Sequence, residues 1–133
     1  MKRNVIALLT ASVLLAGCGA KSSPVGLVDV SRLTANWPKY IDAQNQLNAD
    51  EQAILASKGS KSSKTQQVAQ LQQKYAGIES GLVKQVRDAA TQIAQKKSMK
   101  LVLTREYVGY GGTDITPDVE QVLGITEKAT PSP

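Results

Sequence analysis

The sequence contains no histidine and no phenylalanine, and its 133 residues include only one cysteine and one tryptophan. The absence of histidine excludes imidazole metal ligands and imidazole general bases. A single cysteine excludes a disulfide within the chain. Because large apolar side chains are so few, a short chain of this kind buries a core poorly by itself, and association with further copies is the expected remedy. We predict no catalytic site, no cofactor and no metal site.

The first 17 residues have the pattern of an export signal. Two basic residues precede an apolar stretch, residues 5–15, which is shorter than the roughly 20 apolar residues that a membrane-spanning helix needs. The stretch ends in Leu15-Ala16-Gly17-Cys18, which resembles the lipobox of bacterial lipoproteins. We therefore predict that residues 1–17 are cleaved and that Cys18 carries the lipid. The alternative, an ordinary signal followed by an unrelated cysteine, leaves a lone thiol in an oxidising compartment and is disfavoured.

The remaining chain reads as one domain between two polar ends. Residues 18–24 form a short polar tether, residues 25–126 a single domain, and residues 127–133 a disordered tail. Several acyl chains on one cysteine anchor a protein stably, so the expected location is the bacterial cell envelope, facing the periplasm. The residue after the cysteine is Gly19 and not aspartate, which favours the outer membrane over the inner one.

Hydrophobic periodicity predicts a strand followed by a helical hairpin. Val25–Val30 is a β-branched run typical of a buried strand, and Ser31 is a suitable N-cap for a short helix over 32–36. Trp37-Pro38 interrupts this helix, and Pro38 suits the first turn of a second helix that ends near residue 57. After a polar break, residues 64–97 carry an apolar stripe at spacings of three and four. Since this stripe is narrow, the long helix is expected to pair with the preceding one as an antiparallel coiled-coil arm, about residues 38–97.

Beyond the arm the pattern changes to short strands. Leu101–Thr104 and Tyr107–Tyr110 are predicted strands, and Gly111-Gly112 a loop. Thr116 is a predicted N-cap for a last short helix, which ends at Gly124. The predicted fold class is α+β: a small antiparallel or mixed sheet body that carries a helical hairpin arm.

This order of elements resembles the Skp/OmpH family of periplasmic chaperones. The similarity depends on the opening strand with its short helix, on Leu101-Val102-Leu103 after the long helix, and on Asp114-Ile115-Thr116-Pro117-Asp118-Val119. The resemblance implies a homotrimer with an intersubunit β-barrel, whose arms surround a cavity for unfolded membrane proteins. The residues that it places in the oligomer body are Val25, Leu27, Val28, Val30, Leu101, Val102 and Leu103. The arm is shorter than is usual in that family.

Lysines gather where the arm turns. Between Gln52 and Ile78 the sequence has Lys58, Lys61, Lys64 and Lys74 and no acidic residue. These four are the predicted binding residues for clients or for anionic partners, anionic lipid included. The alternative that they only solvate an exposed turn remains open. Nucleic acid is excluded as a partner by the expected compartment.

Two further groups were considered as sites. Gly109–Gly112 lacks the Gly-Lys-Ser/Thr of a phosphate-binding loop and is expected to be a flexible connection. Four charged residues lie near predicted strand ends: Asp29, Arg105, Glu106 and Asp114. An acid/base pair among them is conceivable, but salt bridges and loop solvation are the stronger expectation.

The sequence thus favours a binding protein without catalysis. The leading hypothesis is a lipid-anchored chaperone or holdase for unfolded or membrane-destined proteins. The alternative is a structural or adaptor lipoprotein whose short arm docks on one specific envelope partner.

Overall fold

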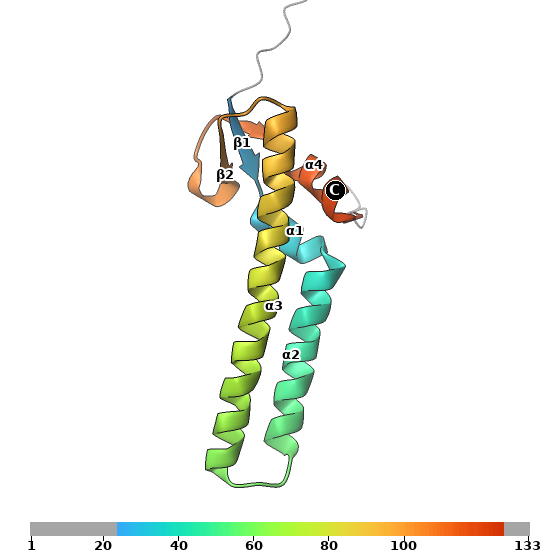
Figure 1. Ribbon diagram of the computed structural model, residues 1–133, viewed down its shortest axis with the longest axis vertical. Coiled ribbons are helices and arrows are strands. Elements are labelled where there is room, and N and C mark those ends of the chain that lie inside the picture. The colour runs from blue at the N-terminus through green and yellow to red at the C-terminus, as the bar shows by residue number, and fades with distance from the viewer. Residues whose placement is uncertain (1–23, 127–133) are drawn as a thin grey trace, which may run out of the picture.

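The computed structural model describes residues 24–126, which form a small parallel sheet with helices around it and a protruding helical arm (Figure 1). The elements in chain order are β1 (Val25–Val28), α1 (Val30–Asn36), α2 (Pro38–Ala56), α3 (Lys61–Lys96), β2 (Leu101–Thr104), a 3₁₀ turn (Arg105–Tyr107), β3 (Thr113–Asp114) and α4 (Thr116–Leu123). The predicted α+β class with a helical hairpin is therefore confirmed. The export signal, Cys18 and the C-terminal tail lie outside the described residues.

The sheet is parallel throughout, so the expectation of antiparallel pairing was wrong. Its order is β2-β1-β3, with Val25 opposite Leu101 and Gly26 opposite Thr113. The reason lies in the unequal lengths of the paired helices, since α2 has 19 residues and α3 has 36. The longer helix returns past the start of α2 to the end of the sheet where β1 begins. There Lys100 N–H donates to the Pro24 carbonyl at 2.8 Å, and β2 starts beside β1 in the same direction.

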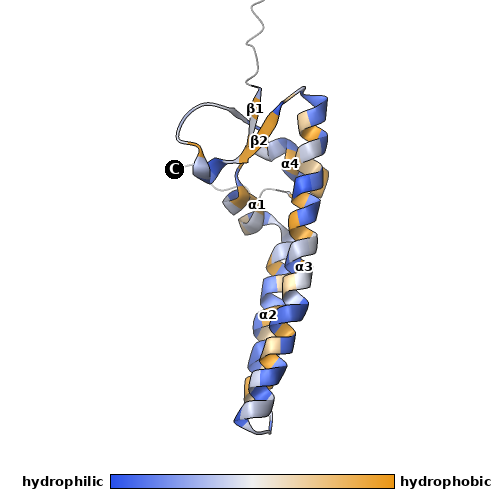
Figure 2. Cartoon of the chain, turned by 60° about the vertical axis from the view of Figure 1, so that its left-hand side comes forward, coloured by the Kyte–Doolittle hydropathy of each residue, from blue (hydrophilic) through white to orange (hydrophobic). Residues whose placement is uncertain are grey.

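The core lies where the second half of α3 crosses the sheet, α1 and α4. Leu33, Ile115 and Val119 are wholly buried there, together with Trp37 and Ile93. Figure 2 shows α1, α4 and the strands gathered around this half of α3, whereas the other half runs beside α2 alone. In the arm α2 buries no residue, and the first half of α3 buries only Tyr75. The arm is consequently a thin pair of helices rooted in a packed body.

The expected starts of two short helices shift because polar side chains cap them differently. Asp29, in an extended conformation, accepts the N–H of Arg32 at 2.8 Å and is the N-cap of α1 in place of Ser31. The helix therefore begins at Val30, which was wrongly placed in the strand. Likewise Thr116 is the first residue of α4 and not its cap. Its N–H donates to Asp114 Oδ1, and its hydroxyl accepts the Asp29 N–H, both at 2.9 Å.

The predicted strand Tyr107–Tyr110 is absent from the described structure. The chain makes a 3₁₀ turn after β2 and an open loop instead, and both tyrosines are at least nine-tenths exposed. Because β3 is parallel to β2, this segment has to return to the starting end of the sheet. The segment reaches this end at Gly112, which has a φ of 87°. The Gly112 backbone lies so close to Leu27 that no side chain fits there. A methyl group there would lie 2.6 Å from Leu27 Cγ.

Candidate functional site: an apolar groove beside a free strand edge

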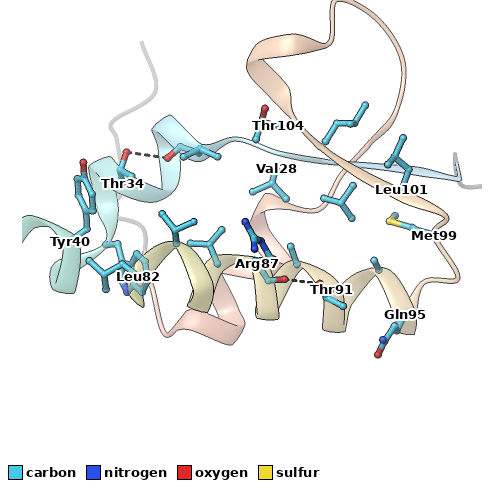
Figure 3. Close-up of a pocket in the computed structure, with 18 of the residues that line it drawn as sticks. Val28, Thr34, Tyr40, Leu82, Arg87, Thr91, Gln95, Met99, Leu101 and Thr104 are labelled. Carbon is cyan, nitrogen blue, oxygen red and sulfur yellow. Dashed lines mark hydrogen bonds between the residues drawn. The ribbon is translucent and has the colours of Figure 1, made fainter. Parts of the chain in front are cut away.

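A groove of about 760 Å³ lies between β2 and the second half of α3. Figure 3 shows side chains from both elements converging on it, with Val28 and Leu101 on the sheet side and Arg87 and Thr91 on the helix. Most of its lining is apolar, and its charged residues are of both signs, Glu79 with Arg87 and Lys100. The groove can therefore accept an apolar segment of another polypeptide.

Small side chains on α3 hold the groove open. Ala90, Thr91 and Ala94 line its helical wall, so no bulky residue there reaches across to β2. Met99 and Val102 close the end near the start of β2, and Trp37 and Tyr40 close the end near the arm. The groove thus extends from the start of β2 to the root of the arm.

The strand beside the groove has an open edge. Within the described part of the chain β2 pairs with β1 alone, so the backbone groups on its other side have no strand partner. Leu101 is 50% exposed and Leu103 38%, although both are large apolar residues. Figure 2 shows β2 as a hydrophobic strand at the surface. An exposed apolar edge strand is a template for pairing with another chain, and soluble proteins normally protect such an edge.

The predicted body residues divide between the groove and the interior. Val28, Val30, Leu101, Val102 and Leu103 line the groove, while Leu27 is buried against Gly112. Val25, half-buried, begins β1 opposite Leu101. The structure therefore brings five of the seven to the groove, although Val28 is itself buried in the core.

At the arm tip, three of the four predicted lysines come together. Lys58 lies in the turn, Lys61 begins α3, and Lys64 Nζ donates to the carbonyl of Leu55 across the turn. Lys61 and Lys64, but not Lys58, line a hollow of about 640 Å³, which Glu51 and the exposed Leu55 also line. The tip is therefore basic but not purely so, since one carboxylate lies among the lysines.

Lys74 does not belong to the tip. It lies ten residues beyond Lys64, about 15 Å along the helix at 1.5 Å per residue, and its ammonium stands 5.3 Å from the centre of the Tyr75 ring. Tyr75 donates a hydrogen bond to Asp50 on α2 at 3.1 Å. Burial raises the pKa of Tyr75, and this hydrogen bond raises it further. The pair fastens α2 to α3, so Lys74 marks the middle of the arm.

The four charged residues near the strand ends are engaged in structural contacts. Arg105 pairs with Asp114 at 2.9 Å, Asp29 caps α1, and Glu106 accepts from Ser31. The Glu106 pKa lies below its usual value, chiefly because of a hydrogen bond from its own backbone. Burial by itself would raise the Asp114 pKa, but hydrogen bonds from Thr116 and the charges of Arg105 and Arg32 outweigh burial and lower it. These contacts stabilise Glu106 and Asp114 as anions.

One ion pair was not predicted from the sequence. Arg32 on α1 binds Glu120 on α4 through two hydrogen bonds of 2.8 and 2.7 Å, and the Glu120 side chain is only 6% exposed. An acidic residue within the apolar pattern of a short helix was the available signal, but nothing in the sequence identified its partner 88 positions away.

The described residues hold no group of three metal-binding side chains, and none of their helices is long and apolar enough to cross a membrane. No protein-family model matches the chain, and neither the curated proteins nor the solved structures yield a match to it. The groove, the strand edge and the tip are thus the features from which a function is argued.

Proposed function

We propose that the protein is a lipid-anchored envelope chaperone that holds unfolded or membrane-destined proteins, as the resemblance to Skp/OmpH suggests. The observation that carries the proposal is the apolar groove along the open edge of β2. A surface of this kind pairs with another chain through backbone hydrogen bonds and apolar side chains, and the chain that we place on it is a further copy of the protein.

Self-association through this surface builds the body of the proposed chaperone. Three copies that cover one another's β2 edges would form a shared β-body, and their arms would then project around a common space. Residues of the predicted body line the groove that such assembly would fill: Val28, Val30, Leu101, Val102 and Leu103. In this arrangement clients occupy the space between the arms, and the tip lysines attract acidic segments of the client.

The arms suit many weak contacts better than one strong contact. Their outer surfaces are polar, and the exposed apolar side chains on them, such as Ile41, Leu55 and Ile78, are scattered. Several such contacts acting together retain a client although each one is weak.

The test is suppression of aggregation. An unfolded outer-membrane β-barrel protein is diluted from urea, and light scattering is followed with and without the mature protein. We expect suppression at three chains per client, weakened by high salt and by the triple variant K58Q/K61Q/K64Q. K84Q is the matched control, because Lys84 is exposed and already paired with Asp88 at 2.6 Å.

Undiminished aggregation at this ratio would refute the chaperone proposal. A crosslinking pull-down from envelope extracts then examines the adaptor alternative. One dominant folded partner supports an adaptor, whereas many heterogeneous clients support a holdase.

A further inference from the structure

Three lysines lie close together at the end of the body where the tether joins it. Lys96 and Lys97 end α3, Lys100 precedes β2, and all three are exposed. The Lys100 N–H donates to the carbonyl of Pro24, the first described residue, at 2.8 Å. This anchor-side lysine cluster (Lys96, Lys97 and Lys100) therefore lies beside Pro24, where the described part of the chain begins.

The cluster carries a positive charge that the fold does not neutralise. Lys97 pairs with Asp118 at 2.7 Å, but neither Lys96 nor Lys100 takes part in an ion pair within residues 24–126. Cations at the C-terminus of a helix interact well with its dipole, which explains Lys96 and Lys97. It does not explain Lys100, which lies beyond the helix. The sequence adds Lys21 in the tether itself.

Chain length limits what can reach the membrane. Residues 18–24, fully extended, span about 20 Å at roughly 3.3 Å per residue. The opposite end of α3, whose 36 residues rise about 1.5 Å each, lies about 54 Å away. Charges interact across water over only about 10 Å at moderate salt. Of the two basic ends of the molecule, the anchor-side cluster is the one that the tether keeps near the bilayer.

We propose that the anchor-side lysine cluster binds anionic phospholipid headgroups of the membrane that holds the anchor, and so directs the arm away from that membrane. The inference rests on the lipid anchor of the proposed function. The acyl chain makes the contact intramolecular, so a few lysines suffice.

The proposal gives the two basic ends different roles. The anchor-side cluster orients the molecule, and the tip lysines face the aqueous space where clients pass. A molecule lying flat on the membrane would place both ends on the headgroups.

The experiment measures orientation by energy transfer. The acylated mature protein, with a dye at S98C or at S60C, is reconstituted in vesicles that carry an acceptor dye at their surface. The vesicles contain phosphatidylcholine with or without phosphatidylglycerol. We expect strong transfer from position 98 and weak transfer from position 60 on the anionic vesicles. The transfer from position 98 should fall on neutral vesicles and in high salt.

Variants then separate the cluster from the tip. K96Q/K100Q should lower the transfer from position 98 and reduce the ratio of upright to flat molecules about 25-fold, since each of the two surface lysines contributes roughly a fivefold preference for an anionic membrane. The tip variant K58Q/K61Q is the matched control and should leave the transfer from position 98 unchanged. Circular dichroism confirms that both variants fold.

The outcomes distinguish this inference from the function it rests on. Equal transfer from positions 98 and 60, or no response to K96Q/K100Q, refutes the membrane contact alone. A chain whose mass shows no acyl group refutes the anchor and this inference together. Aggregation assays on the same acylated protein test the chaperone proposal separately.

Discussion

At the scale of single residues, a few positions require one residue type because of their backbone conformation or their close neighbours. Gly111 and Gly112 have nearly the same backbone angle, φ 88° and 87°, yet only Gly112 lies against a neighbour. The pair therefore separates the conformational need for glycine from the steric one.

We expect G112A to lower the free energy of unfolding by about 2–4 kcal/mol, because a left-handed backbone and a clash with Leu27 both act against it. G111A meets the same backbone cost in open space and should lose about 1–2 kcal/mol. Urea unfolding of both variants measures the difference. Equal losses would mean that the contact with Leu27 has no energetic weight.

The lowered pKa of Asp114 predicts a dependence of stability on pH. A carboxylate whose pKa is lower in the folded chain stabilises the fold fully above its ordinary value of 3.8, and this contribution is lost as the pH falls through the lower folded value. Thermal unfolding of the wild type should therefore shift downward as the medium becomes acidic. D114N should have a lower melting temperature than the wild type at neutral pH, and its melting temperature should fall less on acidification. D118N, which removes the ion pair with Lys97, is the control. The same acid loss in D114N and wild type would contradict the assignment.

At the scale of the elements, the arm and the body differ in how firmly they are held. The buried residues of α3 are Leu82, Ala89, Ala90 and Ile93 in the body, but only Tyr75 in the arm. Local opening is cheapest where few apolar contacts are lost.

We predict that amide hydrogens over residues 61–71 exchange at least about tenfold faster than those over 82–93 of the same helix. Hydrogen exchange followed by mass spectrometry resolves the two stretches. Uniform protection along α3 would show that the arm is packed more firmly than its contacts indicate, as it would be if other chains covered it.

The elements also show how far the sequence alone could lead. The periodicity predicted α3 as 64–97, close to the observed Lys61–Lys96, and Gly124 ends α4 in a left-handed conformation as expected. Sheet direction was not obtained in that way, because periodicity finds strands without saying which strands pair or in which direction. The groove was equally hidden, since Ala90, Thr91 and Ala94 look like ordinary helix surface until β2 is placed opposite them.

At the scale of the whole molecule, the chain has three surfaces with distinct chemistry: a basic tip, an apolar groove beside an open strand edge, and a basic end at the tether. Of the three surfaces, the groove has the strongest tendency to associate with another chain, because its exposed apolar side chains lie next to unpaired backbone groups. Self-assembly would cover this surface, and it would also compensate for the scarcity of large side chains noted in the sequence.

The most direct test of this account is the mass of the unanchored protein in solution, measured by sedimentation equilibrium. Three times the mass of one chain is predicted, and L103K, which places a charge on the half-exposed β2 edge, should reduce it to the mass of one chain. L55K is the control, because Leu55 is 56% exposed on the arm and far from the sheet. A wild-type protein that stays a single chain at micromolar concentration would contradict the assembly and with it the enclosed space between the arms.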